Sequence, residues 1–361
     1  MAKVLVIGAG PVGLTLAIEL QRYGIDFRIV EKTAARTDKS KALVVWSRSL
    51  ELLERSGLSD RFVAAGRKVD AANIIAGDKR IAHISLRAVD TPYPYALILP
   101  QSETGRRLET ALAQRGVTVE REVEATALTP GHDGAVVSLR RADGSAMESP
   151  FDWVVGCDGA HSLVRHSLSM TFEGDTLLSD FILADVHLKG FPIPENELGI
   201  YWHEDGVLAV FPITPGRFRV VADLGTSQGP HPPTPTLDEV QAIVDRRGPG
   251  GVTVTDPVWL SGFRINERKV RDYRAGRLFL AGDAAHIHSP AGGQGMNTGM
   301  QDAFNLAWKL ALVIKGVVPN GALLDSYSTE RSAVGDKVLA DATRLTALVV
   351  MRNHAAQTIR N

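Results

Sequence analysis

The sequence predicts an α/β fold in which a parallel sheet is interrupted by a block of antiparallel strands. The pattern of residues 3–31 indicates a βαβ unit, and unbroken apolar runs recur at Trp153–Val155 and Leu278–Ala281. Unbroken apolar strands are typical of a parallel sheet that is covered on both faces. Between about 170 and 265 the hydrophobic period changes to two, which favours antiparallel strands with one covered face. We therefore expect a discontinuous domain and a second domain inserted into it.

The βαβ unit begins with a strand that ends before Gly8. A helix from about Val12 to Tyr23 follows and is ended by Gly24, and a second strand covers Phe27–Val30. Helical spacing predicts further helices over Ser47–Arg55, Gln101–Arg115, Leu237–Arg247 and Met296–Ile314. The Pro-rich stretch Gly229–Pro235 is interpreted as a surface connection.

These elements divide the chain into five segments. Residues 1–75 and 101–170 are expected to form two parts of the first domain, and 76–100 to supply strands to the second. Residues 171–268 are expected to form the antiparallel domain, and 269–361 to return to the first domain and add C-terminal helices.

The composition is that of an ordinary folded protein. The 361 residues can bury a large core, with 44% hydrophobic and 22% charged side chains. A formal net charge of -1 gives no broad attraction for nucleic acid or an anionic membrane. Cys157 is the only cysteine, so no intramolecular disulfide or cysteine-bound metal is expected, and the cytoplasm is the expected compartment. The apolar run Val4–Ile7 is too short for a signal peptide or a membrane span.

The first motif is a glycine-rich turn between strand and helix. Gly8 permits the tight turn, Gly10 lets a pyrophosphate approach the backbone, and Gly13 lets helix and strand pack closely. Glu31, at the end of the second strand, can accept hydrogen bonds from ribose hydroxyls, and the helix N-terminus near Val12 favours phosphate. The motif predicts a dinucleotide site, and it serves NAD and FAD alike.

The second motif follows the strand Leu278–Ala281. Asp283 can accept hydrogen bonds from ribityl hydroxyls, and the segment Gly293–Asn297 opens a helix whose N–H groups would face developing negative charge. A reduced flavin develops such charge at N1 and the C2 carbonyl, so this motif favours FAD over NAD. The alternative is that Asp283 caps a turn and the glycines only shape a loop.

The third motif is Asp158-Gly159 with Ser162 and Arg165. An Asp-Gly turn capped by Ser is also common for structural reasons alone, so this motif by itself leaves a functional and a structural role open.

In this order and spacing, the segments Gly8–Gly13, Cys157–Arg165 and Gly276–His286 resemble those of the FAD-dependent aromatic hydroxylases, the flavoprotein monooxygenases typified by para-hydroxybenzoate hydroxylase. The resemblance implies a discontinuous Rossmann-like FAD-binding domain with an inserted antiparallel-sheet substrate domain. It also implies tightly bound FAD, and NAD(P)H as a transient cosubstrate. Leu280–Asn297 and Tyr327–Arg331 look closest to the hydroxylases of phenols, polycyclic polyketides and antibiotics.

The resemblance, together with the motifs, assigns the expected FAD contacts. They are Gly8, Gly10, Pro11, Val12, Gly13, Glu31, Lys32, Lys41, Arg48, Gln101, Val123, Asp158, Asp283, Pro290, Gly293, Gln294, Gly295, Met296 and Asn297. Two departures stand out. Lys41 replaces the Arg of many relatives and loses a planar bidentate donor, and the chain ends soon after Asn353, where many relatives continue.

The chemistry implied by the resemblance is reduction of FAD by NAD(P)H, capture of O2 as a C4a-hydroperoxyflavin, and transfer of oxygen to an electron-rich ring. Pro290 looks like the family's proline over the reactive face of the flavin. A phenol attacks better as phenolate, so His288 or His203 is a candidate base, although either histidine could be a packing residue. Candidate lining residues for the substrate are Tyr201, Trp202, His203, Phe211 and Pro212.

Two other functions fit the same motifs. One is a flavin-dependent dehydrogenase or reductase that needs no O2, and the other is a flavin-bearing binding protein with vestigial turnover. The sequence leaves the substrate, the choice of NADPH or NADH, and a monomeric or homodimeric state open.

Overall fold

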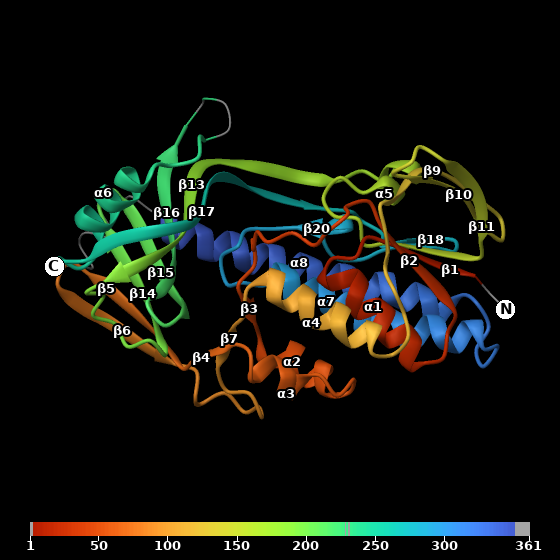
Figure 1. Cartoon of the computed structure of the whole chain (residues 1–361), viewed down its shortest axis with the longest axis horizontal. Coiled ribbons are helices and arrows are strands. Elements are labelled where there is room, and N and C mark those ends of the chain that lie inside the picture. The colour runs from red at the N-terminus through yellow and green to blue at the C-terminus, as the bar shows by residue number, and fades with distance from the viewer. Residues whose placement is uncertain (1–2, 228, 230–231, 351–361) are drawn as a thin grey trace.

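A computed structural model describes residues 3–227, 229 and 232–350 of the chain (Figure 1). The first sheet has six strands in the order β18-β19-β12-β1-β2-β8. Their bounds are β1 Val4–Ile7, β2 Phe27–Glu31, β8 Glu120–Arg121, β12 Trp153–Gly156, β18 Arg274–Ala275 and β19 Leu278–Leu280. All neighbours pair in parallel except β18 with β19. Segments from three distant parts of the chain therefore share one sheet.

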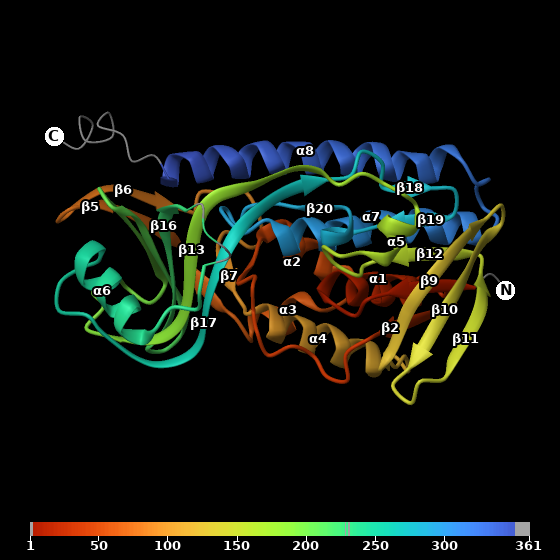
Figure 2. The same cartoon turned by 90° about the horizontal axis from the view of Figure 1, so that it is seen from above.

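Helices lie on this parallel sheet or pack onto the helices that do. They are α1 Pro11–Arg22, α2 Ser47–Glu54, α3 Ser59–Val63, α4 Gln101–Ala113, α5 Leu163–Ser167, α7 Gly295–Ile314 and α8 Ala322–Val350. Helix α1 packs against both α4 and α7, and α8 lies along α7 (Figure 2). In the part of the chain that the structure describes, no helix combines the length and apolar character needed to cross a membrane.

The second large sheet has eight strands in the order β20-β17-β13-β16-β15-β14-β5-β6. Their bounds are β5 Ala71–Ala76, β6 Lys79–Ser85, β13 Glu173–Lys189, β14 Glu197–His203, β15 Gly206–Thr214, β16 Arg217–Thr226, β17 Thr253–Lys269 and β20 His286–Ile287. Helix α6, Leu237–Arg247, covers one face of the sheet. The long strands β13 and β17 extend from this sheet toward the parallel sheet (Figure 2).

Two small sheets complete the fold. One is formed by β3 Val44–Val45, β4 Arg67–Val69 and β7 Ala96–Ile98. The other is a meander of β9 Val123–Gly131, β10 Gly134–Arg141 and β11 Ala146–Phe151. A 3-10 turn, η1, covers Gly282–Ala284.

The predicted fold class is confirmed, and the element boundaries differ in detail. Helix α1 begins at Pro11 rather than Val12, because proline suits the first helical position, where an N–H would have no partner. The large sheet takes in residues from 71 on, before the expected start at 76. Residues 96–98 lie in a small sheet instead, and the meander lies within the expected segment 101–170. Positions 230 and 231 of the Pro-rich stretch lie outside the described residues.

Candidate functional site

The turn after β1 is closed so tightly that two of its glycines cannot be replaced. Gly8 has φ +102°, and its N–H donates to the Val30 carbonyl at 2.9 Å. A Cβ on Gly8 would lie 2.4 Å from the Cys157 carbonyl oxygen, and one on Gly13 would lie 2.0 Å from the Gly8 oxygen. In contrast, a Cβ on Gly10 would meet nothing within 4 Å. The open side of Gly10, at the N-terminus of α1, is where a pyrophosphate fits.

Glu31 braces this turn from the end of β2. Its Oε2 accepts a hydrogen bond from Ala9 N at 2.9 Å, and its Oε1 accepts bonds from the N–H and hydroxyl of Thr33. A carboxylate has about four acceptor positions, so Glu31 retains capacity for a ribose hydroxyl. Lys32 beside it is exposed, and Val123 begins β9 directly after β8, the strand that pairs with Glu31.

The late Gly-Asp turn packs directly onto the first turn. Gly282 has φ +62°, and a Cβ there would lie 2.8 Å from the Val12 side chain. A Cβ on Gly299 of α7 would lie 2.7 Å from the same side chain and 2.9 Å from Gly282 Cα. Asp283, between the two, is exposed. The first and second motifs therefore border one site, with the partly bonded Glu31 carboxylate on one motif and the exposed Asp283 on the other.

The N-terminus of α7 begins at Gly295, and the first helical bond runs from Thr298 N to the Gln294 oxygen. The N–H groups of Gly295, Met296 and Asn297 precede that bond, as predicted for a helix terminus that faces negative charge. The loop before them contains Pro290, which is exposed and accepts a hydrogen bond from Gly293 N at 2.9 Å.

The Asn297 side chain uses its hydrogen bonds to hold the start of α7 against the segment around Trp46. Its Oδ1 accepts bonds from Trp46 N and the Ser49 hydroxyl, and its Nδ2 donates to the carbonyls of Val44 and Gly293. The indole of Trp46 donates to the Gly292 carbonyl at 2.9 Å. The side chain of Asn297 thus has no capacity left for a cofactor, and only its main chain can take that role. Trp46, which ties the loop down from the other side, was not predicted.

The two carboxylate oxygens of Asp158 differ: one has a structural role, and the other has no hydrogen-bond partner among the described residues. Oδ2 accepts bonds from Leu163 N and Val164 N at the start of α5. Oδ1 is buried and has no hydrogen-bond partner among the described residues, and burial raises the pKa of Asp158. Arg165 donates to the Ala284 carbonyl at 3.0 Å and the Ala160 carbonyl at 2.6 Å. Arg165 therefore links the third motif to the second by a hydrogen bond.

The segment around Lys41 lies against the large sheet. Gln101 is bonded to both the N–H and the carbonyl of Ala42. The Lys41 side chain is exposed, and its carbonyl accepts a bond from Arg219 at 3.0 Å. Arg219 is buried and forms a two-bond ion pair with Asp185. Sequence reasoning did not find this link, because nothing local pairs β13 with β16.

Arg48, another expected FAD contact, pairs on the surface. Its guanidinium lies 2.8 Å from Glu51, and 67% of its side chain is exposed. Among the described residues, its guanidinium forms no hydrogen bond or ion pair with the glycine turns.

The two candidate bases lie in different places. His288 Nδ1 lies 3.1 Å from the Ser289 carbonyl, which can only accept, so Nδ1 carries the proton and Nε2 is an acceptor. Nε2 is buried without a partner among the described residues, and burial lowers the pKa of His288. His203, at the β14–β15 turn, accepts a bond from Asp205 N at 3.2 Å. The structure does not bring His203 to His288.

The predicted lining residues lie on both faces of the sheet. Tyr201 packs in the core under α6, and strand alternation places His203 on that same face. Pro212 pairs with Phe218, which also belongs to this core. Trp202 and Phe211 therefore point the other way, and Phe211 packs beside the β3 segment. Of these two, Phe211 packs against residues of the first domain, whereas Trp202 is exposed.

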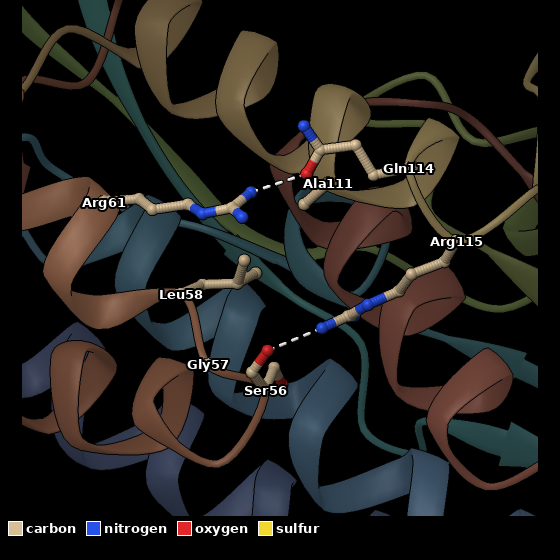
Figure 3. A pocket seen from close by; sticks show the side chains of 7 residues that line it. All are labelled: Ser56, Gly57, Leu58, Arg61, Ala111, Gln114 and Arg115. Carbon is tan, nitrogen blue, oxygen red and sulfur yellow. Dashed lines mark hydrogen bonds between the residues drawn. The ribbon is translucent and has the colours of Figure 1, made fainter.

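One small cavity lies away from these turns. It has a volume of about 90 Å³ and is lined by Ser56, Gly57, Leu58, Arg61, Ala111, Gln114 and Arg115 (Figure 3). Arg115 donates to the Ser56 carbonyl at 2.5 Å, and Arg61 to Gln114 at 2.6 Å. The first bond joins the segments that follow α2 and α4, and the second joins α3 to the end of α4, which is a structural role.

Asp302 is a further residue that was not predicted from the sequence. It lies beside the predicted apolar face of α7 and is fully buried with His286. The available signal was an acidic residue within the predicted helix, between Met300 and Ala303 of its apolar face.

A parallel sheet with a glycine turn, an acidic strand end and a second Gly-Asp turn packed onto it defines a dinucleotide-binding flavoprotein with an added antiparallel domain. Comparison with known proteins agrees: residues 1–342 match the family described as FAD binding domain. The chain belongs to this family of FAD-dependent aromatic hydroxylases, which bind FAD.

The relatives include proteins named as monooxygenases and hydroxylases. The chain is 40% identical to 6-methylpretetramide 4-monooxygenase of Streptomyces rimosus over 98% of its own length and 63% of that protein. It resembles the structure of the anhydrotetracycline hydroxylase from Streptomyces rimosus with a TM-score of 0.82 and 33% identity, covering 99% of this chain and 72% of that one. An aklavinone-11 hydroxylase in complex with FAD and aklavinone has a TM-score of 0.87 and 26% identity, covering 99% and 70%.

Proposed function

We propose that the protein is an FAD-dependent monooxygenase that uses NAD(P)H and O2 to hydroxylate a phenolic or polycyclic aromatic substrate. The observation that supports the proposal most directly is that the Gly282 turn and Gly299 pack onto Val12. This contact brings the glycine-rich turn after β1 and the later Gly-Asp turn together, as the two parts of one dinucleotide site. The relatives named as monooxygenases support it, although the chain spans only 63% of the length of the first of them. The single cysteine favours a cytoplasmic location for the proposed enzyme.

FAD bound here would supply hydride acceptance from NAD(P)H and activation of O2, which is chemistry that no side chain can supply. The residues of the chain would hold and orient it. The open side of Gly10 and the N-terminus of α1 would receive the pyrophosphate, Glu31 the ribose and Val123 the adenine. Asp283 would accept hydrogen bonds from the ribityl hydroxyls.

At the other end, the main-chain N–H groups at the start of α7 would stabilise negative charge on a flavin ring held there. The exposed Pro290 would contact the same ring from the loop before α7, and Lys41 and Gln101 would contact it from the segment around Ala42.

The substrate binds between this loop and the large sheet. The face opposite α6 presents Phe211 and Trp202, whose rings suit a flat aromatic substrate. His288 Nε2 is an unprotonated acceptor without a hydrogen-bond partner among the described residues, and we propose that it takes the proton of a substrate hydroxyl. A neutral imidazole at neutral pH suits that role, because its lowered pKa keeps it unprotonated.

The test is to purify the protein, record its visible spectrum, and measure NAD(P)H oxidation and O2 uptake with a panel of phenols and polycyclic aromatic compounds. The expected result is a yellow protein whose O2 uptake rises with an accepted substrate and matches product formation. A dehydrogenase would turn over without O2, and a vestigial binding protein would show no stimulation by any compound. A colourless protein that gains no flavin on addition of FAD would contradict the whole proposal.

A further inference from the structure

Asp302 is the centre of a buried network behind the Gly-Asp turn. Its side chain is fully buried in α7. Oδ2 accepts bonds from Gly282 N at 3.0 Å and His286 Nε2 at 2.7 Å, and Oδ1 accepts a bond from Arg331 Nε at 2.6 Å. The three donors come from the η1 turn, β20 and α8, so one carboxylate of α7 joins two neighbouring elements, η1 and β20, to the more distant α8.

Electrostatic interactions with neighbouring side chains keep the Asp302 carboxylate ionised. Burial raises the pKa of Asp302, but His286 and Arg331 outweigh that effect and keep the pKa below its ordinary value. The carboxylate therefore accepts all three bonds at once, as only an acceptor without protons of its own can.

The His286 ring extends the network toward the proline loop. It stacks on Tyr273 with ring centroids 5.7 Å apart and on His288 with centroids 6.1 Å apart. The planes of the two histidines differ by only 8°. The edge of His288 in turn lies at the start of α7, where a Cβ on Gly295 would be 3.9 Å from His288 Nε2. The orientation of His288 thus depends on a ring that Asp302 holds.

We propose that Asp302 is a positioning residue for the cofactor: it sets the Gly282–Asp283 turn for the ribityl chain and, through His286, the His288 ring beside the proline loop. This inference rests on the proposed function, because it takes FAD as the cofactor. Asp283 follows Gly282 directly, so a shift of the bonded Gly282 N–H moves the ribityl acceptor with it. Asp302 itself touches neither the cofactor nor the substrate.

The test compares Asp302→Asn with His286→Phe. Asparagine replaces one acceptor oxygen by an amide group, so at least one of the three donors loses its partner. Phenylalanine keeps the Asp302–Arg331 pair and a stacked ring but removes the bond to Asp302. The matched control is Glu330→Gln, which weakens another α7–α8 ion pair, Lys309 to Glu330 at 2.7 Å, without touching the Gly282 turn.

The readouts are the FAD dissociation constant, from quenching of flavin fluorescence, and the melting temperatures of the apoprotein and the FAD complex. We expect D302N to raise the dissociation constant at least tenfold and H286F several-fold, with E330Q within twofold of the wild type. A merely structural role would lower both melting temperatures equally and leave FAD affinity unchanged.

The inference is overturned if folded D302N binds FAD within twofold of the wild type, or if E330Q weakens binding as much. If D302N does not fold, H286F decides: wild-type affinity in that variant overturns the inference. A wild-type protein that binds no FAD contradicts the proposed function as well, which separates the two failures.

Discussion

Gly10→Ala should separate cofactor affinity from stability. Gly10 has φ -73° and ψ 178°, which any residue adopts, and a Cβ there would meet nothing within 4 Å. Alanine should therefore leave the apoprotein intact or stabilise it by about 0.4–1 kcal/mol, because it restricts the unfolded chain. The same methyl group projects into the space that the pyrophosphate needs.

The expected loss of affinity follows from the hydrogen bonds at the N-terminus of α1. A methyl group holds the phosphate back by about one bond length, which breaks at least one charge-assisted bond worth about 1.5–3 kcal/mol. At about 1.4 kcal/mol for each factor of ten, the FAD dissociation constant should rise roughly tenfold to a hundredfold.

The assay pairs an FAD titration with thermal unfolding of the apoprotein. Gly13→Ala is the matched control, since its Cβ would lie 2.0 Å from the Gly8 oxygen and should destabilise the apoprotein itself. The reasoning is refuted if Gly10→Ala binds FAD as tightly as the wild type, or if its apoprotein is destabilised as much as that of Gly13→Ala.

Three further predictions follow from the site. Glu31→Gln should weaken FAD binding by about tenfold in the same titration, because it loses the charge that attracts the ribose donors; unchanged binding would exclude the ribose role. Arg165→Met should destabilise the protein by about 2–4 kcal/mol in urea unfolding, since two carbonyls lose their donor, while the exposed Arg140→Met should cost less than about 1 kcal/mol. The folded-state pKa of His288 lies below its unfolded value of 6.5, so the unfolded chain binds the proton first and stability should fall as the pH drops below about 6.5. His288→Asn should flatten the melting temperature between pH 5 and 7, and an unaltered slope would show that His288 is not the group responsible.

Much of the local structure around the candidate cofactor site could be predicted from the sequence. The glycine turn, Glu31 and the start of α7 depend on spacing within one strand-turn-helix segment, and such segments have few alternative geometries. Helix α6 was predicted at Leu237–Arg247 and has those bounds, since Thr236 and Glu239 form a capping box and Gly248 ends it.

The substrate side could not be predicted in the same way. A strand's period shows that Tyr201 and Trp202 face opposite ways, but it does not say which face lies toward the first domain. That is decided by α6, which covers the Tyr201 face and leaves Trp202 and Phe211 on the other.

The sequence by itself determined that a dinucleotide turn and a later Gly-Asp turn exist, because both are short-range patterns of strand, glycine and helix. Only the tertiary structure decided that the two turns meet at Val12. It also decided that the Asn297 side chain forms its hydrogen bonds with Trp46 and Val44, and that Asp302 binds the Gly-Asp turn from behind. The physical reason is distance along the chain: Trp46 and Asn297 are 251 positions apart, and such contacts arise from packing rather than from local pattern.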